Sequence, residues 1–294
     1  MTATVSTKAK IRGVLGSHER TAKLAKFSGF IACIGLAVAV LITPVDVAFA
    51  ATGVPLGTAG SFAVLGGAGV TNTGPTIVNG DLGVSPGTSI TGFPPGIANG
   101  TVHRADPAAA SAQFDSAVAY GALAAQTCTR TFPVPTDLVG MTLVPGVYCF
   151  ASSASNSGLL KLDALGDTNA VWVFKTVSTL ITSSGSSVVP VNGAQACNVY
   201  WQVGTSATLG TGTRFIGNIL AYANIALMTG STLSGRALAR IESVTLDSSN
   251  VNSCSLGSSS SSGAAVPTLS QWMIMILAAL LVVVGAVATR RSTR

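Results

Sequence analysis

Short apolar runs separated by turn residues fill most of the chain between residues 55 and 254. Two typical runs are 171–174 (VWVF) and 199–203 (VYWQV), and Gly, Ser, Asn and Thr are frequent between such runs. Strands in compact domains commonly span about four to eight residues and are bounded by turn residues. The pattern therefore predicts a mainly β domain, which we place at 51–254.

One segment of this domain departs from the strand pattern and predicts a helix. Asp106 can cap its N-terminus, Pro107 suits the first helical position, and no further proline occurs in the segment 106–126. Phe114, Val118 and Ala122 recur in it every four residues, with small residues beside them. We expect this side of the helix to press closely against a sheet.

Several short segments recur along the strand-rich region. Residues 232–239 (TLSGRALA) repeat the pattern of 214–221 (RFIGNILA), and 244–246 (VTL) repeats 225–227 (IAL), each after roughly 18–19 residues. Such a period, with glycines at the corners, is typical of parallel β-solenoids. An earlier copy, 76–83 (TIVNGDLG), aligns with 232–239 and precedes the helix. Since one repeat cannot bury its apolar side alone, this copy must pack beside later coils, and the solenoid is discontinuous.

The first residues of the chain carry an export signal. A basic segment ends at Lys26 and is followed by the apolar run 27–42 and by Ala-Phe-Ala at 48–50. This order predicts a signal peptide over 1–50 that is removed after Ala50. An uncleaved membrane anchor is the alternative.

The chain ends in a second apolar segment. A Ser/Gly linker at 255–265 is followed by the tail 266–294, in which 273–288 carries no charge and two arginines follow. The apolar stretch is near the short limit of about 17 residues for crossing a bilayer, and the arginines predict a cytoplasmic end. The tail resembles the IPTL-CTERM sorting signal of Gram-negative bacteria, although Val266 replaces its leading Ile. The matching residues are Pro267, Thr268, Leu269, Ser270 and Trp272.

That resemblance implies a location and two partners. The domain would be exported to the cell surface or secreted, and it would be anchored transiently in the inner membrane by a transmembrane helix over 273–288. An exosortase-type protease would remove the tail. A permanent single-span anchor is the alternative.

Charge is sparse and is concentrated at the two ends. Only 9% of the residues are charged, and the net charge is +6. Basic and acidic residues nearly balance between 51 and 289, so the excess of positive charge belongs to the predicted membrane signals. A nucleic-acid binder needs a cationic surface on the folded domain. We therefore expect no nucleic-acid partner.

Cysteine usage agrees with export. Cys128, Cys149, Cys197 and Cys254 remain after the predicted signal peptide. An even number in an exported domain predicts two disulfides, for which three pairings are possible. We favour Cys128–Cys149 with Cys197–Cys254, because these close the shorter loops without crossing. Four free thiols are the alternative.

No group of residues in this domain predicts catalysis. Solenoid enzymes that act on polysaccharides need clustered carboxylates or a cation site, whereas Asp and Glu are scattered here. His103 is the only histidine after the predicted signal peptide, no G-x-S-x-G elbow accompanies it, and we interpret it as a loop residue. We expect no enzyme, no catalytic residue, no metal and no cofactor.

Four stretches of the domain resemble the bacterial and fungal ice-binding-like (antifreeze) family. They are 70–76 (VTNTGPT), 80–87 (GDLGVSPG), 198–204 (NVYWQVG) and 233–239 (LSGRALA). The resemblance covers nearly the whole domain. It implies a discontinuous, three-faced parallel β-solenoid with one long helix packed alongside, and binding of ice crystals through one flat face.

The flat face of this family often carries a Thr-(Ala/Gly)-x-(Thr/Asn) motif. Residues 229–232 (TGST) match it fully, while 205–208 (TSAT) and 182–185 (TSSG) depart from it. Threonine suits such a face because its β-branch restricts χ1 and because its methyl and hydroxyl groups both order water. The predicted ice-binding face comprises Thr182, Ser184, Thr205, Thr208, Thr229, Ser231, Thr232, Thr245 and Ser248.

The sequence is compatible with two functions. The first is ice binding by a monomer, as antifreeze activity, inhibition of ice recrystallisation or adhesion to ice. The second is a cell-surface adhesin or biofilm-matrix module without ice activity, which the tail favours. A polysaccharide enzyme is a weaker third candidate, since the clustered carboxylates it needs are missing.

Overall fold

The computed structural model describes residues 51–254. The predicted signal peptide at 1–50, the linker at 255–265 and the tail at 266–294, which contains the apolar segment 273–288, lie outside the described residues. Within 51–254, no helix combines the length and the apolar character that crossing a bilayer requires.

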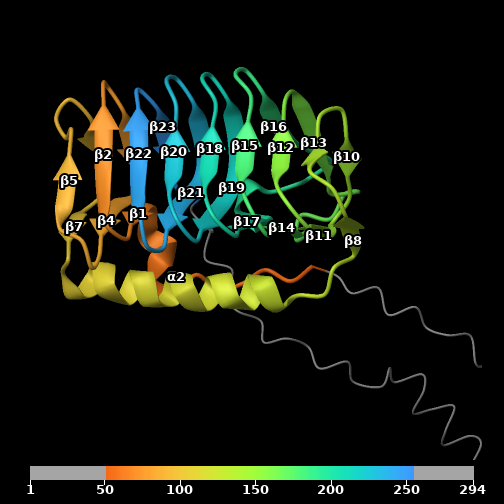
Figure 1. The fold of residues 1–294 in the computed structure, drawn as a ribbon, viewed down its shortest axis with the longest axis horizontal. Coiled ribbons are helices and arrows are strands. Elements are labelled where there is room, and N and C mark those ends of the chain that lie inside the picture. The colour runs from red at the N-terminus through yellow and green to blue at the C-terminus, as the bar shows by residue number, and fades with distance from the viewer. Residues whose placement is uncertain (1–50, 255–294) are drawn as a thin grey trace, which may run out of the picture. The chain divides into compact units, whose positions relative to one another are not determined.

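The described chain forms a parallel β-solenoid from two sheets (Figure 1). One sheet has eight strands, in the spatial order β5 (Ser89–Thr91), β2 (Gly69–Thr73), β22 (Ser243–Asp247), β20 (Ile225–Leu227), β18 (Ala207–Leu209), β15 (Leu180–Thr182), β12 (Ala154–Asn156) and β9 (Thr136–Asp137). The other has 15 strands, and its longest path is β6 (Ile97–Ala98), β3 (Ile77–Asn79), β23 (Asn250–Asn252), β21 (Thr232–Ala239), β19 (Arg214–Ala221), β17 (Val199–Val203), β14 (Trp172–Thr176), β11 (Gly146–Phe150) and β8 (Arg130–Phe132). Its remaining strands are β1 (Phe62–Gly66), β4 (Asp81–Val84), β7 (Val102–Arg104), β10 (Thr142–Leu143), β13 (Leu159–Asp163) and β16 (Ser187–Val191). All pairings between these strands are parallel.

The 15-stranded sheet supplies two faces of the solenoid, because its longest strands turn a corner. The first part of β19 pairs with β16 and the second part with β17, while β21 pairs first with β23 and then with β1. The corners lie at Gly217 and Gly235, which are in register and have φ values of 107° and 155°. We call the eight-stranded sheet the flat face, the part of the large sheet around β16 and β23 the side face, and the part around β1 and β17 the helix face.

The predicted repeat corresponds to one coil of the solenoid. Arg214 pairs with Thr232, so successive coils place equivalent residues side by side at the predicted offset. The alignment of the early copy is wrong by one residue, because Thr232 lies level, through β23, with Ile77 rather than with Thr76. A slip of one residue exchanges the two faces of a strand. Thr76 is accordingly fully buried.

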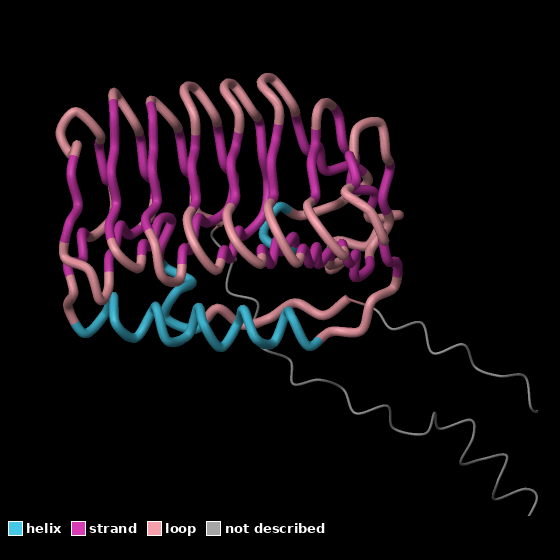
Figure 2. Tube along the Cα trace, viewed as in Figure 1, coloured by secondary structure: helices cyan, strands magenta, loops and turns pink. Residues whose placement is uncertain are grey.

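The early coils stack on the last of the described coils, which makes the solenoid discontinuous as expected. β1, β2 and β3 pair with β21, β22 and β23 respectively. The helix α2 (Pro107–Ala125) then runs along the solenoid to its opposite end, where β8 begins the later coils (Figures 1 and 2). At ~1.5 Å per residue its 19 residues span about 28 Å, which is most of the length of the stack.

The side of α2 that packs on the helix face is not the expected one. Its buried residues are Ala109, Ala112, Ser116, Ala119 and Leu123. Their spacing of three and four residues forms one helical stripe of mostly small side chains, which lets the helix lie close to the strands. Phe114 and Val118 are 70% and 57% exposed, and Ala122 is exposed as well. The prediction that these three residues press against the sheet is therefore wrong.

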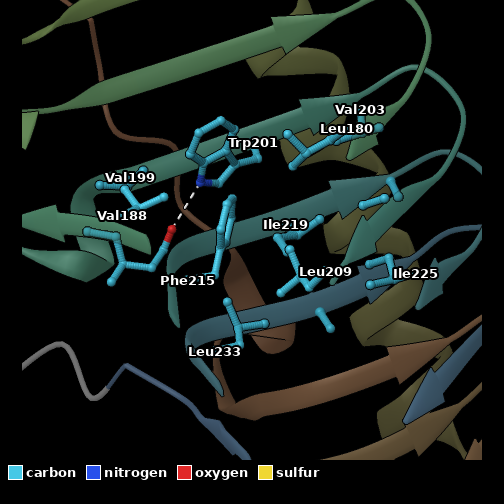
Figure 3. Packing of buried hydrophobic residues seen from close by; sticks show 14 of the residues in the cluster. Leu180, Val188, Val199, Trp201, Val203, Leu209, Phe215, Ile219, Ile225 and Leu233 are labelled. Carbon is cyan, nitrogen blue, oxygen red and sulfur yellow. Dashed lines mark hydrogen bonds between the residues drawn. The ribbon is translucent and has the colours of Figure 1, made fainter. Parts of the chain in front are cut away.

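Large apolar side chains stacked from coil to coil fill the interior. The rings of Phe174 and Trp201, from adjacent coils, lie 3.9 Å apart, and Phe215 follows at 4.8 Å from Trp201. Figure 3 shows Trp201 above Phe215, and the Trp201 indole N–H donates to the carbonyl of Ile216 over 3.0 Å. Such close packing resists deformation, so the outer surface of the coils is held in one shape.

Candidate functional site

One line of outward-facing side chains crosses all strands of the flat face. In spatial order its residues are Thr91, Thr71, Thr245, Ala226, Thr208, Ile181, Ser155 and Asp137. We call this line the central row. The strand residues just before them point inward and are buried, as Val70, Val244 and Ala207 illustrate.

The strand pairing gives the central row a regular repeat. Neighbouring parallel strands lie ~4.8 Å apart, so eight strands make a row roughly 34 Å long. The register is continuous across the flat face, whereas on the helix face β1 and β4 show a register shift. In Figure 1 these strands stand side by side as one broad sheet.

Most side chains of the central row are stiff before any ligand arrives. Thr91, Thr71, Thr245, Thr208 and Ile181 are β-branched, which restricts rotation about χ1. The backbone beneath them is held on both sides by parallel neighbours, except at the two ends of the sheet. The row is therefore a preorganised surface that loses little conformational entropy when it touches another surface.

Charge on the central row is confined to its end. Asp137 is the one charged residue of the row, and it lies in the terminal strand β9. Its carboxylate accepts hydrogen bonds from the amide of Ser157 over 3.0 Å and from the Ser157 hydroxyl. Partial burial acts to raise the pKa of Asp137, but these hydrogen bonds, together with backbone hydrogen bonds such as that from Val139, outweigh it and the pKa is lowered.

The central row contains two of the nine predicted ice-binding residues, Thr208 and Thr245. Two others, Thr182 and Ser231, are buried, with exposed fractions of 3% and 0%. The Thr182 hydroxyl accepts from the amide of Gly210 over 2.9 Å and lies 3.0 Å from the Thr213 hydroxyl. A buried hydroxyl cannot touch a crystal surface, so the inclusion of Thr182 and Ser231 in the predicted ice-binding face is wrong.

The other five predicted residues lie beside the flat face rather than on it. Thr205, Ser184, Thr229 and Ser248 lie in turns at its borders, and Thr232 opens β21 on the side face. The stretch 229–232, which matches the motif fully, thus forms a corner, with Gly230 at a φ of 70°. The Thr229 hydroxyl donates to the Asp247 carboxylate, which also accepts from Ser248.

Three hydroxyl residues of the central row, Thr71, Thr91 and Ser155, were not among the predicted ice-binding residues. Thr71 follows a buried valine in the same way that Thr245 follows Val244, and this alternation was the available signal. It could not be used alone, because the stacking of β2 on β22 joins segments from opposite ends of the domain.

One of the two expected disulfides is present. Cys128 and Cys149 are bonded, with their Cα atoms 5.8 Å apart, which joins the segment after α2 to β11. Cys197 and Cys254 are free thiols, and both line one cavity between the chain ends of the domain.

His103 lies in β7 and not in a loop, because its segment pairs with β4. Its Nδ1 is 2.7 Å from the carboxylate of Asp106, which caps α2 by accepting the amide of Ala109 over 2.8 Å. The bond from Ala109, followed by that from His103, lowers the pKa of Asp106. Within residues 51–254, no cluster of three or more His, Cys, Asp or Glu side chains could hold a metal ion.

Known proteins are similar to this domain in both sequence and fold. A family model described as Ice-binding-like matches residues 64–252. The ice-binding protein of Nostoc sp. (strain HG1) is 54% identical over 201 residues, which cover 68% of this chain and 74% of the relative. The ice-binding protein of Leucosporidium sp. (strain AY30) is 34% identical over 222 residues, which cover 68% and 83%.

Solved structures give the same result. The crystal structure of the ice-binding protein from the Antarctic ascomycete Antarctomyces psychrotrophicus has a TM-score of 0.68 and 46% identity, over 69% of this chain and 100% of that chain. An ice-binding protein from an Antarctic biological consortium has a TM-score of 0.68 and 45% identity, over 72% and 95%. The whole ascomycete chain thus matches part of this one. The chain described here belongs to the ice-binding-like family.

Proposed function

We propose that this protein binds ice, and that the central row of the flat face is the contact surface. The observation that carries the proposal is the row itself, in which Thr or Ser occupies five of eight positions on strands in continuous register. The relatives named above as ice-binding proteins support the same function.

The chemistry of the row suits adsorption to a water lattice. A threonine methyl orders the adjacent water, while its hydroxyl donates to or accepts from that water. Each contact is weak, so stable adsorption needs many contacts made at once by a rigid surface. Side chains repeated every ~4.8 Å over roughly 34 Å meet this need.

A bulky side chain in the middle of the central row tests the proposal. Residues 51–254 are expected to inhibit ice recrystallisation, and Thr245→Tyr is expected to raise the concentration needed at least about tenfold, because one protruding ring lifts neighbouring contacts off the crystal. Thr142→Tyr is the matched control, since Thr142 is exposed on the side face. Equal loss in both variants, or no loss in either, would contradict the assigned surface.

Adsorption to ice through the central row would make the protein a binding protein rather than an enzyme. The stiff, nearly uncharged central row needs no bound cofactor to touch ice, and one domain is sufficient, so we propose that it acts as a monomer. The alternative of a matrix adhesin without ice activity gains no support from the relatives reported above, which are named as ice-binding proteins.

We further propose that the domain works outside the cytoplasm, released by cleavage after Ala50 and held transiently in the inner membrane by 273–288. The apolar runs, the basic flanks and the tail that resembles a sorting signal support this. The protein is expressed in a Gram-negative host with an exosortase, and its intact mass is measured. The mass should correspond to a mature protein that starts at Ala51 and lacks most of 266–294. A cytoplasmic protein that retains 1–50 would contradict export, and a membrane-bound form that retains the tail would favour the permanent anchor.

A further inference from the structure

Two cysteines from distant parts of the chain line one cavity of about 510 Å³. Cys197 lies in the 3₁₀ turn η2 (Ala196–Asn198) directly before β17, and Cys254 follows β23. Cys197 is half-buried and Cys254 is 8% exposed. An oxidant in solution can therefore reach Cys197 more easily than Cys254.

A buried polar network holds the two cysteines next to each other. The Arg236 guanidinium, in a side chain only 3% exposed, donates to the carbonyl of Cys254 over 2.6 Å and to Oδ1 of Asn218 over 2.9 Å. The Asn218 amide in turn donates to the carbonyl of Cys197 over 3.0 Å. Within the described residues Arg236 has no carboxylate partner. The network fixes both cysteine backbones and places a positive charge beside both thiols.

The two thiols differ in their readiness to lose a proton. A hydrogen bond from the Cys254 thiol, opposed by burial and assisted by the charge of Arg236, lowers the pKa of Cys197 to about 7. The same hydrogen bond and burial raise the pKa of Cys254. Because the thiolate is the reactive form, Cys197 is the nucleophile of the pair near neutral pH.

We propose that Cys197 and Cys254 form a redox site that closes to a disulfide when the protein meets a disulfide oxidant. The Cys197 thiolate attacks one sulfur of the oxidant, forms a mixed disulfide and expels one thiolate. The Cys254 thiol then loses its proton and displaces the second thiolate, which leaves Cys197 bonded to Cys254. Two electrons and two protons pass from the cysteine pair, and the oxidant is reduced to thiols. This step does not depend on ice binding.

The position of Cys254 gives this bond a structural consequence. Cys254 follows β23, which lies between β21 and β3 and so joins the later coils to the early coils. Across the same junction, Asn252 accepts from the side chain of Asn79, and Asn79 accepts from Asn99, each over 2.6 Å. The disulfide would fasten the strand on which the early coils stack. Because the bond would close the long loop between Cys197 and Cys254, we expect it to raise the Tm by roughly 8 °C or more.

Mass spectrometry of the full chain tests the pairing. The protein is equilibrated with glutathione disulfide, denatured in iodoacetamide and digested without reduction. The expected result is a Cys197–Cys254 linked peptide beside the Cys128–Cys149 peptide. Alkylated Cys197 and Cys254 in molecules that carry the Cys128–Cys149 bond, or either cysteine paired elsewhere, would overturn the proposal. Ice activity plays no part in the readout, so the proposed function can fail or hold independently.

Single variants test the order of the two steps. After reduction and brief exposure to glutathione disulfide, Cys254→Ser should accumulate glutathione on Cys197, because the second step is blocked. Cys197→Ser should acquire glutathione on Cys254 at least about tenfold more slowly, since that thiol is buried and protonated. Equal rates would overturn the assignment of Cys197 as the nucleophile. Both variants should lack the rise in Tm that the oxidant gives the unmodified protein, and a retained rise would overturn the structural role.

Discussion

Gly235 is a residue whose missing side chain decides the architecture. It lies at a corner of β21 with a φ of 155°, and a Cβ there would overlap the carbonyl group of Gly217 in the adjacent coil. Backbone atoms cannot move aside as a flexible side chain can, so the two coils would have to separate. The corner thus depends on glycine for both its conformation and its close approach.

The substitution Gly235→Ala is expected to lower the free energy of unfolding of residues 51–254 by at least about 2 kcal/mol. Gly121→Ala is the matched control, because a Cβ at this exposed helical glycine meets nothing within 4 Å. The control is expected to be more stable by about 0.5–1 kcal/mol, as alanine favours the helix. Chemical denaturation measures both changes, and a neutral Gly235→Ala would show that the corner is not tightly packed.

At the scale of elements, one carboxylate ties α2 to the start of the domain. Asp115 accepts the amide and the hydroxyl of Thr58, each over 2.7 Å, and Thr58 lies in the 3₁₀ turn η1 (Gly57–Ser61). Chiefly the hydrogen bond from the Thr58 side chain, and then that from its backbone, lower the pKa of Asp115 from the ordinary value of 3.8. The ionised form is therefore the one that the folded state favours.

This contact predicts a dependence of stability on pH. Because the folded pKa of Asp115 is below the unfolded value, the contribution is complete above pH 3.8 and is lost as the pH falls through the folded pKa. Asp115→Asn should lower Tm at pH 7, and its difference from the unmodified protein should shrink below pH 3.8. Glu242→Gln, at an exposed carboxylate, is the control and should change Tm little at either pH. A difference for Asp115→Asn that is constant with pH would contradict this role.

The helix and the strands were largely predictable from the sequence, whereas the side of each element that packs against the rest of the domain was harder to predict. Asp106 and the residues after it predicted α2 almost to its ends, since capping and helix continuity are local properties. The side of α2 that packs was not predictable from residue size. The large apolar side chain of Phe114 favoured the prediction that it is buried. The close approach of the helix to the strands instead requires the stripe of small side chains that contains Ala112 and Ala119.

Across the whole molecule, the flat face depends on a junction that no local pattern reveals. Thr71 and Thr91 come from the first coils, and they extend the central row only because β2 stacks on β22. The period of the later coils was visible in the sequence because Arg214 and Thr232 begin two adjacent copies of the repeat. The alignment of the early copy missed by one residue, and in a strand that error moves every side chain to the other face.

The motif at 229–232 illustrates the same limit. Its residues match the family pattern, yet Ser231 is buried and Thr232 lies on the side face, because the chain turns a corner at Gly230. A motif identifies residue types, whereas the pairing of strands decides which of them share a surface. The central row follows from that pairing and contains Thr208 and Thr245 from the predicted set.

A tyrosine scan with thermal hysteresis as the readout shows whether ice contacts the central row or the corner beside it. Six threonines of residues 51–254 are replaced singly, three in the central row (Thr71, Thr208 and Thr245) and three outside it (Thr142, Thr229 and Thr232). The first three variants are expected to lose most of the activity and the last three to keep it, while all six remain folded by circular dichroism. Loss at Thr229 and Thr232 with activity retained at Thr208 and Thr245 would overturn the assignment of the central row, because ice would then contact the corner and not the flat face.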